Sequence, residues 1–188
     1  MCFSFEVSIS TFIVTWGISL YLLNKKLDKH QQRNIIFLMI LSSIQIVDAV
    51  LWYIKMKKNR INYIVTSFIL PGILSLQALH NVFIRNDNKN DFISIMTIMG
   101  CVYLFYRFNG YSKTLCNNYF ASPVWGSNEI KLWEFILFAI FIFYPDWKML
   151  LGITVILFPA IHIFAGGAYG SLWCAVANMI AFYYLYKY

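Results

Sequence analysis

The stretch NIIFLMILSSIQIVDAVLWYI, residues 34–54, decides the fold. About 20 apolar residues are enough for a helix to cross the hydrocarbon core of a bilayer, which is about 30 Å thick. Six further apolar stretches fill most of the remaining chain: residues 3–23, 61–84, 92–106, 130–144, 149–165 and 167–186. The sequence therefore predicts an all-α, polytopic transmembrane helix bundle with about seven membrane helices, and a single domain over residues 1–188.

Composition agrees with this prediction, since 60% of the residues are hydrophobic and only 12% are charged. Such a chain falls outside the range of soluble globular domains. Two stretches, 92–106 and 130–144, are short, because about 15 helical residues cover only about 22 Å. Residues 130–165 therefore fit either two crossings or a re-entrant hairpin. We prefer two crossings, because a helix satisfies its own backbone hydrogen bonds in lipid.

The formal charge of +7 comes from basic residues in short loops between the apolar stretches. One group is Lys25, Lys26, Lys29 and Arg33, and another is Lys55, Lys57, Lys58 and Arg60. This pattern predicts contact with anionic lipid rather than with nucleic acid. Lys and Arg divide almost equally between the two sides of a seven-helix topology, so the orientation stays open. The expected partner is the bilayer, a homo-oligomer is compatible with the sequence, and the choice of membrane, viral or host, stays open.

A carboxylate inside the second stretch is the sharpest functional signal. Gln45, Asp48 and Trp52 follow a spacing that puts them on one helix face. An acidic residue at the centre of a membrane helix costs roughly 2.5–3.5 kcal/mol on insertion scales. Asp48 is therefore expected to face the bundle interior, pair with another group or carry a proton.

Other polar residues inside the stretches extend the set of candidates. Gln77 and His80 share one face of the third stretch, His162 lies between two isoleucines, and Ser171, Cys174 and Asn178 share a face of the last stretch. We expect Asn178 to act mainly in helix packing, with Gln45 or Asp48 as partners. The pathway or polar-core candidates are Gln45, Asp48, Trp52, Gln77, His80, His162, Ser171, Cys174 and Asn178.

Several further features carry structural expectations. Ser4, Ser8, Thr11, Thr15 and Ser19 form one stripe on the first stretch, which is typical of close helix packing. Pro71 is placed to kink the third stretch. Arg107 and Glu134 are expected at the level of the lipid headgroups, where a long basic side chain can snorkel. The loop 109–128 fits either a lid or a plain connector.

The four cysteines form no CxxC pair, and no sequence pattern indicates a metal site, so neither a metal nor a cofactor is expected. No lysine lies inside the last stretch, which disfavours a retinal protein.

The residues Met1 to Ser4, the Gln45, Asp48 and Trp52 face, and the segment Gly170 to Cys174 with Asn178 resemble a family of small multi-pass membrane proteins that begin Met-Cys-Phe-Ser. Members of that family occur in bacteria and in large DNA viruses. Its relatives usually carry Glu at the position of Asp48. The resemblance implies a membrane helix bundle and no particular activity.

Three functions compete. The first is a transporter or channel for a small solute, ion or proton, with Asp48 as its intramembrane carboxylate. The second is an intramembrane lipid hydrolase, working through a metal on His80, His162 and Asp48 or through Cys2 as nucleophile. The third is a structural or assembly protein of a membrane, of viral or other origin. The first is favoured and an enzyme is not, because no hydrolase motif is present.

Overall fold

The computed structural model describes residues 4–85, 87, 90–116, 121–128, 130–146 and 169–188. Helices occur in six of the seven apolar stretches, as the sequence predicts. The remaining stretch, 149–165, lies outside the described residues, and with it lies the choice between two crossings and a re-entrant hairpin.

Two of the long helices are built from several segments. The first helix is α1 (Phe5–Leu23), and α2 (Lys29–Ser42) continues into α3 (Ile44–Tyr53). The next helix runs from Arg60 to Arg85 through α4 (Arg60–Ile64), the π-helical segment η1 (Val65–Ile69), α5 (Leu70–Leu79) and the π-helical segment η2 (His80–Arg85). The other helices are α6 (Asp91–Arg107), α7 (Leu132–Phe143) and α10 (Tyr169–Lys187).

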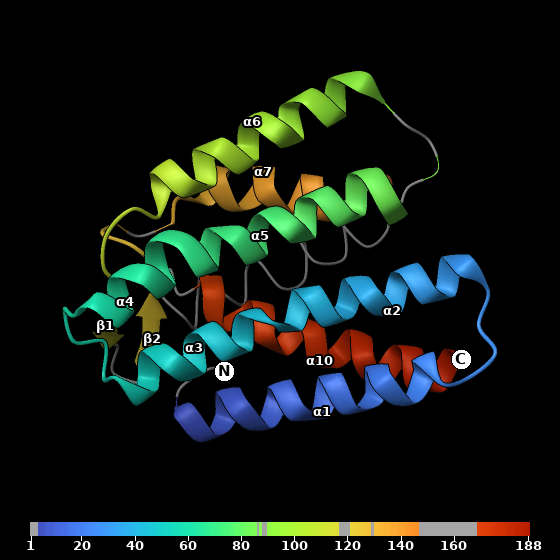
Figure 1. The fold of residues 1–188 in the computed structure, drawn as a ribbon, viewed down its shortest axis with the longest axis horizontal. Helices are drawn as coiled ribbons and strands as arrows, with labels where there is room; N and C mark the ends of the chain where they lie inside the picture. The colour runs from blue at the N-terminus through green and yellow to red at the C-terminus, as the bar shows by residue number, and fades with distance from the viewer. Residues whose placement is uncertain (1–3, 86, 88–89, 117–120, 129, 147–168) are drawn as a thin grey trace.

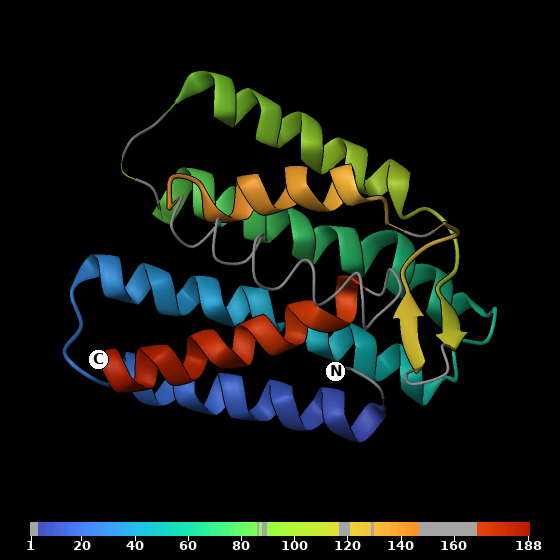
Figure 2. The same cartoon turned by 180° about the vertical axis from the view of Figure 1, so that it is seen from behind.

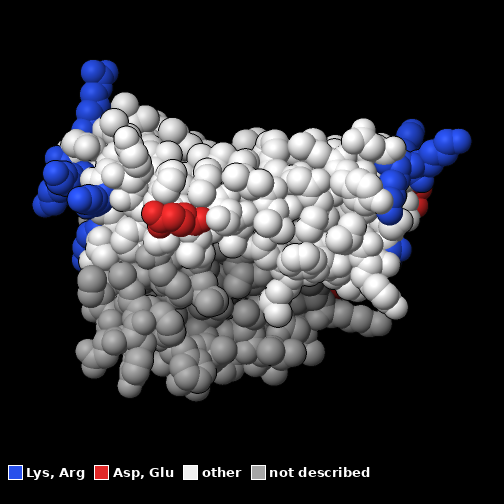
Figure 3. Space-filling model, turned by 90° about the horizontal axis from the view of Figure 1, so that it is seen from below, with Lys and Arg blue, Asp and Glu red and all other residues white. Residues whose placement is uncertain are grey.

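Three helices are long and apolar enough to cross a membrane: Phe5–Leu23, Lys29–Tyr53 and Arg60–Arg85. The protein is therefore compatible with an integral membrane protein, but seven crossings are not shown. The reason is partly length, because α6 has 17 residues and α7 has 12. The face seen in Figure 3 carries its Lys and Arg side chains at the two ends of the molecule and almost none between them. The distribution of basic side chains agrees with a bilayer, since Lys and Arg remain at its two surfaces, and one acidic patch lies between the two ends on this face (Figure 3).

The helices lie side by side with their long axes roughly aligned (Figure 1). α1 and α10 lie at one edge, α6 at the other, and α2, α3, α5 and α7 between them (Figure 2). From α1 to α7 the long helices alternate in direction, with α2 and α3 counted as one helix, whereas α10 runs in the same direction as α7, so the described connections gather at two ends. The hairpin end holds the α3–α4 loop and the two strands, and the carboxyl end holds the α1–α2 loop, η2 and the last turn of α10.

Short polar residues begin several of these helices. Ser4, Asp28, Asn59 and Asn90 each accept a hydrogen bond from the backbone N–H of the third residue after them. Such caps satisfy backbone donors that have no partner within the helix.

Pro71 lies two residues after the end of η1 and occupies the first turn of α5. A proline inside a helix cannot donate its backbone N–H, and its ring clashes with the carbonyl four residues earlier. The helix widens into a π turn just before this point, which is a common way to absorb such a disruption. The expected irregularity at Pro71 is therefore present, and it frees polar side chains of η1 for contacts outside the helix.

A two-stranded antiparallel hairpin departs from the all-α expectation. β1 (Lys113–Cys116) pairs with β2 (Ala121–Val124), and Lys113 lies opposite Val124. The loop that the sequence left undecided thus contains regular structure. Gly110 and Gly126 flank the hairpin with positive φ angles of 144° and 79°, which a side chain would strain. The fold is mostly helical with this single sheet among the described residues.

The hydrophobic core has two clusters, one toward each end. At the carboxyl end Leu22, Leu38, Phe143 and Ala181 are fully or nearly fully buried, and they come from α1, α2, α7 and α10. At the hairpin end the cluster joins α3, η1 and α5 to the end of α6 and to the residue that follows β2, through Leu51, Val65, Leu70, Phe108 and Trp125. The core thus has a cluster toward each end of the bundle, and Ile130 and Phe138 pack against both clusters.

The small polar stripe of α1 is a packing face, as predicted. Ser8, Thr15 and Ser19 are fully buried, whereas Ile13 on the same helix is 61% exposed. α1 packs against α2, α3 and α10. Small side chains let helix backbones approach closely in a membrane.

Candidate functional site

Asp48 lies at the hairpin end on α3 and is fully buried. Its Oδ1 accepts a hydrogen bond of 2.8 Å from the indole Nε1 of Trp125, which directly follows β2. Trp125 is itself buried and packs edge-on against Phe108 at the end of α6. The bond joins residues that are 77 positions apart in the chain, so Asp48 anchors the hairpin to the long helix Lys29–Tyr53.

A second polar cluster fixes the same end of the molecule. The side chain of Asn62, fully buried on α4, donates from Nδ2 to the carbonyl oxygens of Met56 and Ser112, and its Oδ1 accepts from the Ser112 backbone N–H at 2.9 Å. Thr66 of η1 donates to the same Oδ1 and lies 2.7 Å from the hydroxyl of Ser112. Every polar atom of Asn62 thus has a protein partner, and the cluster joins helix, π turn and hairpin.

Ser67 extends this cluster to the glycine at the start of the hairpin. Its hydroxyl donates to the Gly110 carbonyl at 3.2 Å and accepts from the Gly110 N–H at 3.0 Å. Ser67 belongs to η1 and is the residue whose carbonyl a regular helix would have set against Pro71. The π turn therefore helps to position the hairpin.

The carboxyl end contains a cavity of about 430 Å³ between α2, η2, the segment after α7 and α10. This volume lies within the range of small-molecule sites. Its wall is lined by polar, charged and tyrosine side chains: His30, Asn34, Asn81, Arg85, Asp87, Tyr144, Asp146, Tyr183, Tyr184, Lys187 and Tyr188.

Arg85 is the most firmly placed charge at this cavity. Its Nε donates to Asn34 Oδ1 at 2.7 Å, and its Nη1 donates to Asn81 Oδ1 at 3.0 Å. The guanidinium also lies over the Phe37 ring, 5.0 Å from the ring centre, which is a favourable cation–π distance. Asn81 is in turn fixed by its Nδ2, which donates to the carbonyl oxygens of Phe141 and Tyr144.

Arg85 makes no ion pair within the described part of the chain. The described ion pairs are Arg33 with Asp87 at 2.6 Å and Arg107 with Glu134 at 2.6 Å. Neutral amide oxygens therefore hold the guanidinium in place without neutralising its charge. An arginine held in this way is suited to an anionic ligand.

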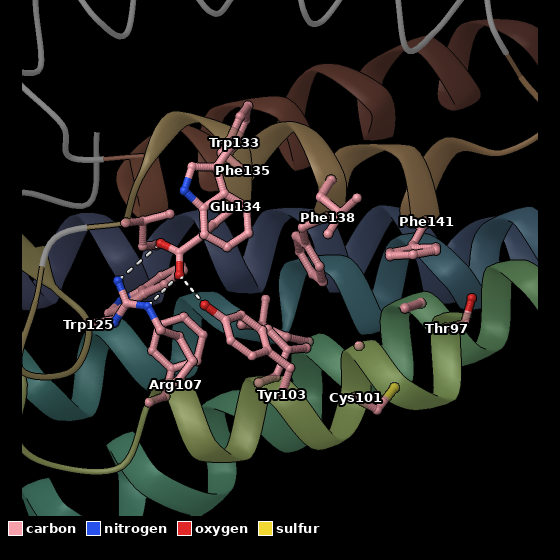
Figure 4. A pocket seen from close by; sticks show the side chains of 17 residues that line it. Thr97, Cys101, Tyr103, Arg107, Trp125, Trp133, Glu134, Phe135, Phe138 and Phe141 are labelled. Atoms are coloured by element: carbon pink, nitrogen blue, oxygen red, sulfur yellow. Dashed lines mark hydrogen bonds and ion pairs between the residues drawn. The ribbon is translucent and has the colours of Figure 1, made fainter. Parts of the chain in front are cut away.

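An apolar pocket of about 80 Å³ lies between α5, α6 and α7. Figure 4 shows Arg107 and Tyr103 of α6 pointing toward Glu134 of α7 at one end of this pocket, with Phe138 and Phe141 further along it. Arg107 binds both carboxylate oxygens of Glu134, and the Tyr103 hydroxyl donates to one of them at 2.7 Å. The two charged side chains are only 13% and 9% exposed, so the snorkelling expected for Arg107 is wrong and the residue is a link between helices.

The residues that the sequence singled out do not converge on one site. Gln45 and Asp48 are fully buried toward the hairpin end, whereas Gln77 and His80 lie on α5 and η2 toward the carboxyl end. Trp52 is half-buried near the end of α3. The hydroxyl of Thr15 on α1 donates to Asn178 Oδ1 at 2.9 Å, so Asn178 ties α10 to α1.

For four residues that the sequence analysis names, no side chain is described. His162 and Cys2 are not among the described residues, and Ser171 and Cys174 are placed only by the backbone of α10. Among the described residues, no three His, Cys, Asp or Glu side chains gather to hold a metal ion. Asp48 and His80 lie toward opposite ends of the bundle, so they do not form a joint metal site.

His80 has a distinct environment beside Arg85. It is 6% exposed, its ring stacks on Phe37 with the two ring centres 6.0 Å apart, and its Nδ1 has no hydrogen-bond partner among the residues described. Packing against Phe37 accounts for the position of the His80 ring, whereas no described residue forms a hydrogen bond with its Nδ1.

Sequence reasoning missed the central residues of both ends. Asn34 enters the sequence analysis only as the first residue of an apolar stretch, Arg85 lies just beyond another stretch, and Asn62 and Trp125 have no role in it. A signal did exist for the carboxyl end, because Gln77, Asn81 and Arg85 follow one another at four-residue spacing on a single helix face. The contacts of Asn62 and Trp125 join distant segments, and no local spacing indicates them.

No protein-family model, curated protein or solved structure matches this chain. The resemblance to small membrane proteins that begin Met-Cys-Phe-Ser thus stays a prediction, and the geometry above is the basis for assigning a function.

Proposed function

We propose that the protein is a multi-pass membrane transporter or channel for a small solute or ion, which enters through the cavity at the carboxyl end. The proposal includes the seven crossings expected from hydropathy, with α6, α7, α10 and residues 149–165 as further membrane segments. The cavity beside Arg85 is the observation that carries it.

The polar face of the third long helix supports an inward path. Arg85 at the cavity wall is followed one turn inward by Asn81 and a further turn inward by Gln77, and the last two are fully buried. Polar residues inside membrane helices commonly mark the route of a solute or ion. Both Asn81 and Arg85 belong to η2, and π-helical segments often occur at functional sites.

Asp48 takes a different part in this proposal. It does not line the cavity at the carboxyl end, and its carboxylate is bonded to Trp125. A path that uses Asp48 as an intramembrane carboxylate requires this bond to open and the hairpin to move. The hairpin then acts as the gate at the opposite end of the bundle.

The test is flux of protons, potassium, chloride and phosphate in liposomes reconstituted with the wild type, Arg85→Gln and Asp48→Asn. Arg60→Gln is the matched control, because Arg60 is exposed at the hairpin end. We expect flux of one species in the wild type and in the control, and a loss of about tenfold or more in Arg85→Gln, since one charge-assisted contact is worth more than 1.4 kcal/mol.

Thermal stability of each variant is measured in parallel. Loss of flux in Asp48→Asn with stability retained supports a path through both ends. No flux in the wild type for any of these species contradicts the proposal.

A structural or assembly role in a membrane is the second candidate. The dense hydrogen bonding of Asp48 and Asn62 favours it, because these groups are enclosed by protein partners. The flux experiment separates the two, since a structural protein gives no flux and Asp48→Asn then lowers only stability.

A further inference from the structure

The donors of Arg85 define what its ligand must offer. Asn34 and Asn81 occupy only part of the N–H donors of its guanidinium. The planar fork that remains matches two oxygens of a single oxyanion, as in phosphate or carboxylate recognition. A halide offers a single spherical acceptor and would use a small part of a cavity of about 430 Å³.

The charges around the cavity favour an anion. Asp87 lines the cavity but forms an ion pair with Arg33 at 2.6 Å, so its charge is offset. Lys187 is exposed at the end of α10, and its ammonium group lies over the rings of Tyr183 and Tyr188, 5.6 Å from each ring centre. Asp146 is the opposing charge, and it is exposed.

Imidazole and hydroxyl groups line the walls as well. His30 lies within hydrogen-bond distance of Asn34, and Tyr144 and Tyr184 line the side formed by α10 and the segment after α7. A tetrahedral phosphate has more acceptor oxygens than a carboxylate and can use an arginine fork, an ammonium and hydroxyl donors together. The mixture of donors therefore fits phosphate better than a carboxylate.

The position of the cavity connects it to the membrane surface. It lies at the carboxyl end, where the α1–α2 loop brings Lys25, Lys26 and Lys29. A basic surface at the end of membrane helices attracts anionic phosphate groups. The phosphate can belong to a lipid headgroup or to a soluble phosphate compound, and the chemistry of recognition is the same.

We propose that the cavity at the carboxyl end binds a phosphate group, held by the Arg85 fork and the Lys187 ammonium. This inference rests on the proposed function in one respect: if the protein is a transporter, the bound phosphate compound is the class of solute that enters through this cavity. Binding itself does not require transport.

The test measures binding on the purified full-length protein. Inorganic phosphate is titrated calorimetrically into the protein in a neutral detergent, and bound lipid is counted by native mass spectrometry after reconstitution with phosphatidic acid or phosphatidylcholine. We expect binding of inorganic phosphate, selective retention of phosphatidic acid, or both. Phosphate binding alone assigns the site to soluble compounds, and retention of phosphatidic acid alone assigns it to lipid.

Variants test whether the phosphate group binds in this cavity. Arg85→Gln is expected to weaken binding by about tenfold or more, and Lys187→Gln by about threefold, since Lys187 is exposed and surface charges contribute less. Arg85→Lys keeps the charge without the fork and is expected to lie between the wild type and Arg85→Gln. Arg60→Gln, at the hairpin end, is expected to bind as the wild type does.

Lys187→Gln also guards against misfolding, because the side chain is exposed and its loss does not disturb packing. The inference is overturned if the wild type binds neither inorganic phosphate nor phosphatidic acid, or if folded Arg85→Gln and Lys187→Gln both bind as the wild type does. Phosphate binding without flux would contradict the proposed transport and support the phosphate site. Flux without binding of inorganic phosphate or phosphatidic acid would support transport and overturn the phosphate site.

Discussion

At the hairpin end the polar side chains of Asp48 and Asn62 are enclosed by protein, whereas at the carboxyl end Asn34 and Asn81 hold an arginine at the wall of a cavity. Both arrangements place polar groups within helices that are long and apolar enough to cross a membrane, where an unmet donor or acceptor would be costly. The comparison teaches that a buried polar residue reports function only when its surroundings leave room for a ligand. Its place inside an apolar stretch made Asp48 the stronger candidate from the sequence, and the contacts point to Arg85.

The largest expected effect is at Asn62. Asn62→Ala removes partners from the carbonyls of Met56 and Ser112 and from the Ser112 N–H. Because these groups are then left buried without a partner, we expect the free energy of unfolding to fall by about 3 kcal/mol. Reversible unfolding in mixed micelles measures it. Asn24→Ala is the control, since Asn24 is exposed and bonds only within its own helix end. Equal, small losses in both would show that the hairpin end is not held by this cluster.

Breaking the Asp48–Trp125 bond is expected to cost somewhat less. Trp125→Phe keeps most of the ring but removes the Nε1 donor to a buried carboxylate, and we expect a loss of about 2 kcal/mol. Asp48→Asn keeps an acceptor oxygen and is expected to lose about 1 kcal/mol. Unfolding of the two single variants and the double variant gives the coupling between the side chains.

Trp133→Phe provides the reference for a tryptophan change, because Trp133 is 53% exposed. Losses that simply add in the double variant would mean that the bond does not hold the hairpin, and Asp48 would again be the leading candidate for a path through the membrane.

Arg85→Gln is expected to change stability by only about 1 kcal/mol. Water in the cavity can take over the hydrogen bonds to the Asn34 and Asn81 oxygens, so these acceptors are not stranded. The same purified variant is compared with Asn62→Ala by unfolding and by phosphate titration. A stability loss as large as that of Asn62→Ala would erase the difference between the two ends and make Arg85 a structural residue.

The smallest expected effect is at the contact between α1 and α10, away from the two polar clusters. Thr15→Val removes the hydroxyl that donates to Asn178 and is expected to cost about 0.6 kcal/mol, which is typical of a hydrogen bond between membrane helices. Thr11→Val is the matched control, since the Thr11 hydroxyl bonds within its own helix. Unfolding curves that do not separate these two variants would limit Asn178 to a packing role.

Hydropathy predicted where the described helices lie because apolar length is a local property of the sequence. It was less able to fix the number of crossings, since α6 and α7 fall short of a full span. The hairpin went unpredicted because its strands are four residues each and depend on contacts with Asn62, Ser67 and Asp48. Short strands have little stability of their own, so their sequence carries a weak signal.

The sequence by itself determined a membrane-compatible helix bundle, the packing stripe of α1, the irregularity at Pro71 and the presence of a buried carboxylate at Asp48. These follow from hydropathy, helical periodicity and the missing N–H of proline, which act over a few neighbouring residues. Only the tertiary structure decided that Asp48 bonds Trp125 and that Arg85 stands free of a described carboxylate beside a cavity. Whether a polar side chain is enclosed by protein or faces a cavity depends on segments far apart in the chain, and no local sequence pattern predicts it.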